Sequence, residues 1–206
     1  MTMKFYMTPG SCTTGIHILL EELELVFEAH LVDLMNGDHR SPEFVAMNPK
    51  MSIPVLVTEE DKVISEFQAI AYWLARSFPR AKLLSDNLDD EVRIIEMMDY
   101  IVGSLHMQGF ARIFTTDKFT PNQSDYEWVK QQGREIIDQG FSVINSSLQG
   151  SDYVANQFSI ADAALFYVEF WADKTDIPLP ENCIKHYQRM RTRPAVRQVL
   201  SEEGYR

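Results

Sequence analysis

The stretch MKFYMTPGSCTTGIHILLEEL, residues 3–23, is the clearest structural signal in the chain. The segment 3–7 alternates between apolar and polar residues, which predicts a short strand, and the Pro-Gly pair after it predicts a turn. A helix should follow, because apolar residues then recur at helical spacing, namely Ile16, Leu19, Leu20 and Leu23. The sequence therefore begins with a strand, a turn and a helix.

Cys12, one of only two cysteines in the chain, lies where this helix should begin. Its neighbours Ser11, Thr13 and Thr14 are residue types that cap helix N-termini. The partial positive charge at a helix start lowers a thiol pKa and favours the thiolate. The alternative is an inert thiol that packs as a small hydrophobe. The polar neighbours favour a chemical role.

The chain up to about residue 82 continues with further strands and helices. Strands are predicted at 27–34, 53–58 and 62–65, and helices at 41–48 and 66–78. The order β-α-β-α-β-β-α is that of a thioredoxin-like domain. Pro54 heads the strand at 53–58, where a proline cannot donate a ladder hydrogen bond and is often part of a cis turn. A cis bond would turn the backbone of Ile53 toward a ligand.

From Leu83 onward the pattern becomes helical throughout. Helices are predicted at 88–115, 123–148, 159–173, 181–191 and 194–201. We therefore predict an α/β thioredoxin-like domain at 1–82 and an all-helical domain at 88–206. Ser159 and Asp162 have the spacing of a capping box, which is a folding signal, and Cys183 should be packed.

Composition excludes several partners. The 206 residues carry a net charge of −11, whereas nucleic-acid binding depends on clustered Lys and Arg. No apolar run approaches the roughly 20 residues that span a bilayer, and the first residues lack the features of a signal peptide. We therefore expect a cytoplasmic protein with no nucleic-acid or membrane partner, whose two cysteines remain thiols.

Several motifs, taken in order, resemble the glutathione transferase family, and most closely its bacterial, cysteine-containing beta class. They are MKFYMTPGSC (3–12) with His17 after it, NPKMSIPVL (48–56), SEFQAIAYWLA (65–75), YIVGSLH (100–106), FSIADAALF (158–166) and RMRTRPAVRQVLSEEG (189–204). The resemblance covers the whole chain. It implies the glutathione transferase fold, glutathione as cosubstrate, no metal, a homodimer and a role in detoxification.

The resemblance also nominates residues that bind glutathione. Ile53, before Pro54, should pair its backbone with the cysteinyl unit, and Glu66 should receive the γ-glutamyl amino group. Phe67 stands where the family usually has a small residue, often serine; its backbone N–H can still bind the γ-glutamyl carboxylate, but the hydroxyl is lost. The remaining candidates are His39 and Arg40 for the glycine carboxylate, with Lys50 as the alternative, and Asp99, which should reach glutathione across the dimer interface.

For catalysis, the resemblance points first to Cys12 beside the glutathione sulfur, with Ser11 or Thr13 as alternative hydroxyl donors. His106 matches a histidine near that cysteine, although Met107 replaces the lysine expected after it. Met7 stands where a tyrosine is often found, which argues against a tyrosine mechanism. The second-substrate pocket should include Tyr167 and Trp171, which at helical spacing could instead be core residues. His17 is assigned to structure.

Two functions follow from this reading. The first is an enzyme that holds glutathione as a thiolate near Cys12 and uses it on an electrophilic small molecule or a disulfide. The second is an interaction protein with the same fold and no activity. Phe67 and Met107 favour this second function because they depart from the family's usual residues at their positions. The sequence favours the enzyme and does not identify the second substrate, because fold alone does not specify chemistry.

Overall fold

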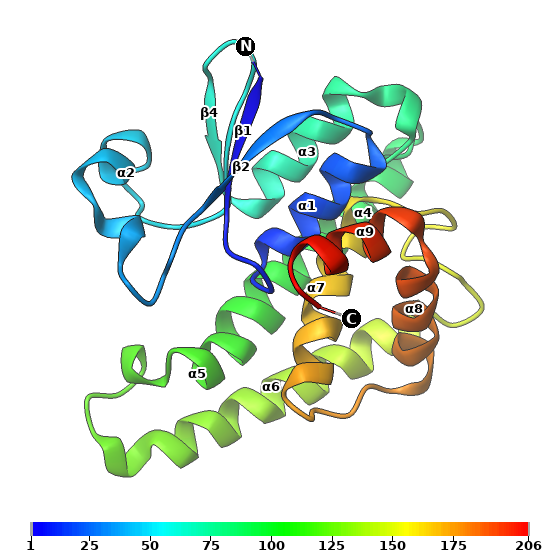
Figure 1. Ribbon diagram of the computed structural model, residues 1–206. Helices are drawn as coiled ribbons and strands as arrows, with labels where there is room; N and C mark the ends of the chain where they lie inside the picture. The colour runs from blue at the N-terminus through cyan, green and yellow to red at the C-terminus, as the bar shows by residue number, and fades with distance from the viewer. Residues whose placement is uncertain (1, 206) are drawn as a thin grey trace. The chain divides into compact units, whose positions relative to one another are not determined.

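The computed structural model describes residues 2–205, which form two compact units (Figure 1). One, the sheet unit, comprises the chain up to Leu84 together with the chain from Arg191. The other, the helical unit, comprises Ser85–Met190. The sequence predicts one helical domain at residues 88–206. In the structure, by contrast, the chain from Arg191 groups with the sheet unit.

The sheet unit contains four strands in the order β2-β1-β3-β4. Strand β1 (Met3–Met7) is parallel to β2 (Phe27–Leu31) and antiparallel to β3 (Val55–Val57), which pairs antiparallel with β4 (Val63–Ser65). Helices α1 (Thr13–Glu22), α2 (Pro42–Met47) and α3 (Phe67–Ser77) complete the predicted order. The predicted elements of this unit are thus all present, with ends that differ by a few residues.

Both faces of β1 are covered, as its sequence pattern requires. Met3, Phe5 and Met7 are buried, and the intervening Tyr6 packs on a separate cluster formed by Val32, Phe44 and Val55. That cluster joins α2 to the sheet, whereas α1 and α3 pack against each other (Figure 1). Helix α1 is therefore fixed by its packing against α3.

Helix α9 (Pro194–Glu202) packs against α1 and thereby belongs to the sheet unit (Figure 1). Its apolar residues Val196, Val199 and Leu200 are buried. Arg193 adds a two-pronged ion pair, because its Nε and Nη2 donate to the carboxylate of Glu22 at 2.6 and 2.8 Å. These contacts explain why the end of the chain groups with the N-terminal residues.

The helical unit contains α4 (Leu88–Tyr100), the π-helical segment η3 (Ile101–Phe110), α5 (Ala111–Phe114), α6 (Tyr126–Ser147), α7 (Ile160–Lys174) and most of α8 (Glu181–Thr192). Segment η3 and α6 cross closely at two glycines: a Cβ on Gly133 would lie 2.8 Å from the carbonyl oxygen of Gly109. Within residues 2–205, no helix combines the length and the apolar character needed to cross a bilayer.

The predicted capping box at the start of α7 is confirmed. The backbone N–H of Ser159 donates to the Asp162 carboxylate at 2.8 Å, and both residues are fully buried. Cys183 is also buried, as predicted, with its sulfur 3.8 Å from the carbonyl oxygen of Phe141. Burial raises the pKa of this thiol, so it is a core residue.

Candidate functional site

Cys12 lies at the N-cap of α1 and is only 8 % exposed. Its sulfur is 3.9 Å from the carbonyl oxygen of Ile53, and the Ile53–Pro54 peptide bond is cis. Burial raises the pKa of the thiol to about 12, and the charge of Glu66 adds to this, outweighing a backbone hydrogen bond that lowers it. The expectation of a lowered pKa is therefore wrong, because loss of hydration exceeds the effect of the helix start.

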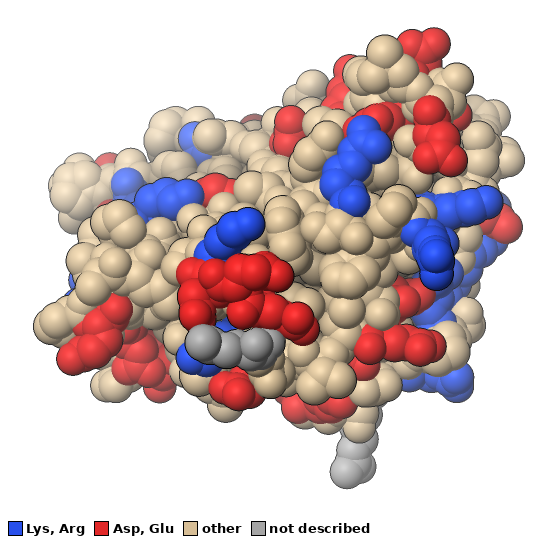
Figure 2. All heavy atoms as spheres, turned by 90° about the horizontal axis from the view of Figure 1, so that it is seen from above, with Lys and Arg blue, Asp and Glu red and all other residues tan. Residues whose placement is uncertain are grey.

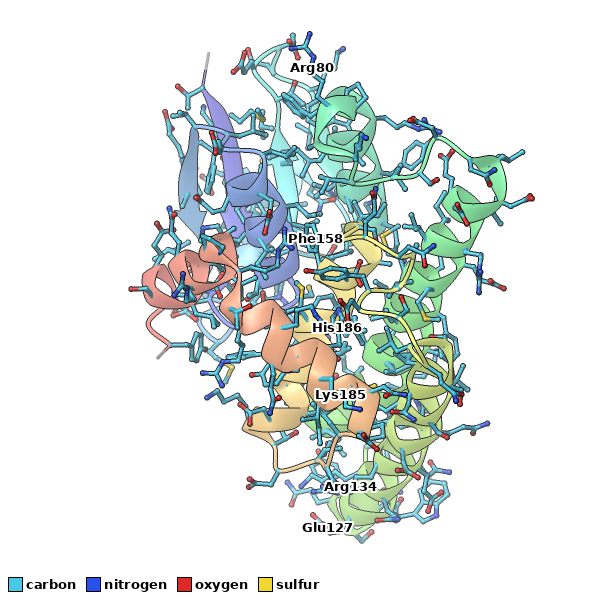
Figure 3. All side chains as sticks on the ribbon, turned by 90° about the vertical axis from the view of Figure 1, so that its right-hand side faces the viewer. Arg80, Glu127, Arg134, Phe158, Lys185 and His186 are labelled. Atoms are coloured by element: carbon cyan, nitrogen blue, oxygen red, sulfur yellow. The ribbon has the colours of Figure 1, made fainter. Side chains whose placement is uncertain are left out.

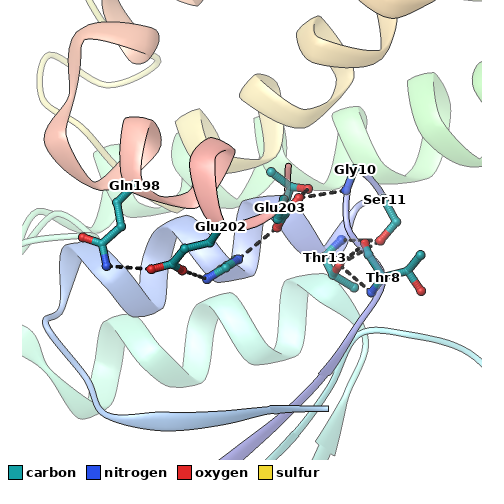
Figure 4. Close-up of polar contacts among 9 residues, drawn as sticks. Thr8, Gly10, Ser11, Thr13, Gln198, Glu202 and Glu203 are labelled. Atoms are coloured by element: carbon teal, nitrogen blue, oxygen red, sulfur yellow. Dashed lines mark hydrogen bonds and ion pairs between the residues drawn. The ribbon is translucent and has the colours of Figure 1, made fainter. Parts of the chain in front are cut away.

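Ser11 and Thr13, the alternative donors, bond to each other and to the turn before them (Figure 4). The Thr13 hydroxyl donates to the carbonyl oxygen of Thr8 at 2.9 Å and accepts from the N–H of Thr8 at 3.2 Å. The hydroxyls of Ser11 and Thr13 lie 2.8 Å apart, and the N–H of Thr13 donates to Ser11 Oγ at 3.1 Å. Because Thr13 gives its proton to Thr8, Ser11 donates to Thr13. Both hydroxyls therefore fix the turn that precedes α1.

Glu66 precedes α3 and has an unusual backbone, with φ 79° and ψ 132°. A non-glycine residue in this region costs of order 1–3 kcal/mol and marks a place where the surroundings impose the conformation. Its carboxylate pairs with the ammonium of Lys50 at 2.8 Å, and both side chains are about half exposed. A cation and an anion thus stand together at the start of α3, open to solvent.

The side chain of Phe67, the first residue of α3, is buried and only 3 % exposed. It therefore belongs to the core of the sheet unit rather than to a ligand surface. The short helix η1 (Asp38–Arg40) carries the two basic candidates. Arg40 is exposed, whereas His39 Nδ1 is buried with no hydrogen-bond partner among the described residues. Arg40 is the more accessible of the two.

Three candidates in the helical unit come together as an aromatic cluster. His106 Nδ1 lies 3.3 Å from the hydroxyl of Tyr167, and the imidazole ring meets the Trp171 ring edge-on at 4.8 Å between centroids. Phe110 and Phe114 extend the cluster over Trp171. Burial lowers the pKa of His106 to about 4, so its imidazole is neutral at physiological pH.

The expectation that Tyr167 and Trp171 line a pocket meets a structural objection. Tyr167 has no exposed surface and Trp171 is 7 % exposed, so the alternative role as core residues describes both better. Phe114 is 50 % exposed and is the most accessible member of the cluster. Asp99 is exposed on α4, at helical spacing from the exposed apolar residues Leu88 and Val92.

Sequence reasoning missed a buried charged cluster that joins α7 to His186 of α8, the residue labelled in Figure 3. His186 Nδ1 lies 2.8 Å from the Glu169 carboxylate, and its Nε2 lies 3.2 Å from that of Asp162. Burial alone would lower the pKa of His186, but the charge of Glu169 and the hydrogen bonds to both acids raise it to about 10. Asp162 was visible as a capping residue, whereas its contact with α8 has no local sequence signal.

Charge on the surface agrees with the acidic composition. On the face drawn in Figure 2, Asp and Glu side chains form several groups, with Lys and Arg side chains interspersed. Nothing on this face, among the described residues, forms the continuous basic surface that a phosphate backbone would need.

Comparisons with known proteins agree on one family. The model of the glutathione S-transferase N-terminal domain matches residues 10–77. Glutathione S-transferase GstA of Escherichia coli O157:H7 is 34% identical over 98% of this chain and 99% of its own length. A glutathione transferase homologue from Sulfitobacter, solved with bound glutathione, superposes with a TM-score of 0.89 at 25% identity, covering 98% of each chain.

A beta-class glutathione S-transferase from Sphingomonas chungbukensis superposes with a TM-score of 0.82 at 26% identity, again over 98% of each chain. These likenesses extend over nearly the whole length of both partners. They confirm the expected fold, a thioredoxin-like domain followed by helices, and the resemblance that the motifs indicated.

Proposed function

The chain belongs to the glutathione S-transferase family, so its expected enzyme class is confirmed, and from this premise we propose that it conjugates glutathione to a small electrophilic molecule. The thiolate of glutathione attacks the electrophilic carbon, a carbon–sulfur bond forms, and the leaving group departs with its electron pair. The proton of the glutathione thiol passes to solvent.

The neutral thiol of Cys12 carries this proposal. With a pKa of about 12, Cys12 keeps its proton at physiological pH and is a donor rather than a nucleophile. Its sulfur lies 3.9 Å from the Ile53 carbonyl oxygen, beside the cis Ile53–Pro54 bond that the family uses to hold the cysteinyl unit. A hydrogen bond to a charged group contributes about 1.5–3 kcal/mol, enough to favour the glutathione thiolate roughly 10- to 100-fold.

The charged pair at the start of α3 suits the other end of the peptide. The γ-glutamyl unit carries an ammonium and a carboxylate, and Glu66 and Lys50 offer one charge of each sign, 2.8 Å apart and half exposed. We propose that Glu66 binds the ammonium and that Lys50 binds a carboxylate of the tripeptide. Phe67 contributes its backbone N–H, since its side chain is buried, and Arg40 is placed ahead of His39 for the glycine carboxylate.

The aromatic cluster of the helical unit is our candidate for recognition of the second substrate. His106 is neutral because burial lowers its pKa to about 4, so it offers a hydrogen bond without a charge. Phe114, half exposed and edge-on to Trp171 at 5.3 Å, gives the cluster an accessible ring. This composition suits an apolar or aromatic electrophile.

A pair of substitutions at Cys12 tests the reaction. Cys12→Ser keeps a donor at the same place, whereas Cys12→Ala removes it. If Cys12 is a donor, the serine variant retains conjugation of glutathione to an aryl halide, and the alanine variant loses roughly 10- to 100-fold in kcat/KM.

The same variants report on thiol–disulfide exchange, the competing reaction, which needs Cys12 itself as nucleophile. Glutathione-dependent reduction of a small disulfide should be equally slow in wild type and in both variants. Conjugation that falls as far in Cys12→Ser as in Cys12→Ala, or fast exchange that only the wild type performs, would contradict the proposal. Glutathione binding, measured by calorimetry, separates a failed reaction from a failed site.

A homodimer, a cytoplasmic location and a detoxification role accompany the proposal. Leu88 and Val92 are exposed one turn apart on α4, and Asp99 follows on the same face. We propose that a second copy covers this face and that Asp99 reaches its partner's glutathione. Light scattering of the wild type and of Val92→Glu checks this: a dimer that the substitution dissociates supports it, and a monomeric wild type refutes it.

A further inference from the structure

A second polar cluster lies on α1 and at the end of α9 and includes none of the residues assigned to glutathione. His17, on α1, is 4 % exposed and meets two carboxylates from the end of α9. Its Nδ1 lies 2.9 Å from Glu203 Oε1, and its Nε2 lies 3.1 Å from Glu202 Oε2. Figure 4 shows the two glutamates side by side above α1, Glu203 bonded to Gly10 and Glu202 to Gln198.

Glu203 is itself rigidly held and orients the imidazole. Its Oε2 accepts from the N–H of Gly10 at 2.8 Å and from the hydroxyl of Thr14 at 2.7 Å, and its side chain is 1 % exposed. A carboxylate only accepts, so His17 Nδ1 carries a proton and donates to it. The other ring nitrogen, Nε2, faces the Glu202 carboxylate at 3.1 Å, and a cation bound there would replace the proton between these two groups. A histidine held by a carboxylate in this way is the usual form of a metal-ligating histidine.

Glu21 supplies a third ligand group. It follows His17 by four residues on α1, so both side chains point to the same side of the helix. One ligand atom each from His17, Glu21 and Glu202 lie within 4.8 Å of one another. In a tetrahedral zinc site with bonds of about 2.0–2.2 Å, ligand atoms stand roughly 3.3–3.6 Å apart. The present 3.1 Å between His17 and Glu202 is already close to that separation.

These three groups line a cavity of about 350 Å³ in the sheet unit. The rest of its wall is mostly apolar, from residues such as Pro9, Leu25 and Phe27, and no Lys or Arg of the described chain lines it. Glu21, Glu202 and Glu203 therefore face a single imidazole. The cavity has room for an ion with its water, and its ligand groups carry excess negative charge.

We propose that His17 Nε2, Glu21 and Glu202 bind a divalent zinc ion, with Glu203 positioning His17. One imidazole nitrogen with two carboxylates suits Zn²⁺ better than Mg²⁺ or Ca²⁺, which prefer all-oxygen sites. The ion would join the end of α9 to the middle of α1. The proposed site departs from the expectation, drawn from the resemblance, that the protein needs no metal, and it gives His17 a role beyond structure.

The test is calorimetric titration of the chelator-treated full chain with zinc chloride. We expect about one ion per chain, and affinity at least about tenfold weaker in Glu21→Gln and in Glu202→Gln. Both substitutions are at partly or largely exposed side chains and keep the shape. Glu24→Gln, an exposed glutamate just after α1, is the matched control and should bind zinc as the wild type does.

Cobalt distinguishes this site from zinc captured by a thiol. Co²⁺ in the proposed site gives weak visible bands without the strong near-ultraviolet band of a cobalt–thiolate bond, and Cys12→Ala leaves both binding and spectrum unchanged. Absence of zinc binding, equal binding in the wild type and both ligand variants, or binding abolished by Cys12→Ala would overturn the proposal. Glutathione binding and turnover should persist in Glu21→Gln, so this inference and the proposed function fail independently.

Discussion

The surroundings of Cys12 and the Asp162–Glu169–His186 cluster both bury ionisable groups, but they treat charge in opposite ways. Cys12 has no buried cation beside it among the described residues, and burial raises its pKa to about 12, so the thiol stays neutral. His186 is also buried, yet two carboxylates at 2.8 and 3.2 Å raise its pKa to about 10, so the imidazole stays charged. His106, which lacks an acid partner in its cluster, follows the first pattern.

The difference shows that burial by itself favours the neutral form of a group, whereas carboxylates beside the buried His186 imidazole favour its charged form. A neutral donor suits a place where a ligand brings its own negative charge, because no internal ion pair must first be broken. A buried cluster whose imidazole and carboxylates pair with one another suits a structural role, joining α7 to α8. The predictions below test this distinction, beginning with the largest expected effect.

Breaking the charged cluster should destabilise the protein most. His186→Leu leaves Asp162 and Glu169 buried without their cation, and removing one member of a buried ion pair costs about 3–5 kcal/mol. Unfolding in urea, followed by circular dichroism, measures the loss. Adding Glu169→Leu should recover part of it, because the second carboxylate is then absent. A loss below about 1 kcal/mol for the single variant would mean that the cluster is not ionised.

The same cluster should make stability fall as pH rises. The folded pKa of His186, about 10, is raised above the unfolded value near 6.5. Its contribution is therefore complete below about pH 6.5 and is lost as pH rises through 10. Glu169, raised to about 7 chiefly by burial, acts in the same direction at lower pH.

Between pH 7 and 9 we expect the free energy of unfolding to drop by roughly 2.5 kcal/mol. Urea unfolding at the two pH values measures the drop, and His186→Leu should flatten the profile. A wild-type profile as flat as that of the variant would show that the histidine is neutral in the folded state.

The strained backbone of Glu66 should lower the free energy of unfolding by about 1 kcal/mol, a loss that glycine at this position would avoid. Glu66→Gly and Glu66→Ala both remove the carboxylate and its pair with Lys50, but only glycine accepts φ 79° without strain. The glycine variant should be more stable than the alanine variant by about 1 kcal/mol in urea unfolding. Both should lose glutathione affinity alike, as calorimetry would show; unequal losses would mean that the backbone, rather than the charge, governs binding.

The smallest effect is expected at His106, whose pKa of about 4 keeps it neutral. The NMR signals of its ring protons can be assigned by their disappearance in His106→Gln. These signals should not move between pH 5.5 and 9, whereas those of His186 should begin to shift at the upper end of this range. A His106 midpoint near 6.5 would place a charge in the aromatic cluster and contradict the comparison.

Much of the fold followed from local pattern. The alternation at 3–7, the Pro-Gly turn and the helical spacing after Thr13 predicted β1, the turn and α1, and the strands and helices up to Ser77 appear in the predicted order. Ser159 and Asp162 predicted the start of α7 because a capping box depends on residues three apart. Such signals are readable because they depend on the chain's own spacing.

The chemistry of the sites did not follow in the same way. Position at a helix start indicated a reactive Cys12, but its ionisation depends on how completely distant segments such as Ile53 exclude water. Likewise, His17 and His186 look alike in sequence, and their partners come from α9 for one and from α7 for the other. Local spacing determines secondary structure, whereas hydration and charge at a buried group depend on residues that only folding brings within a few ångströms.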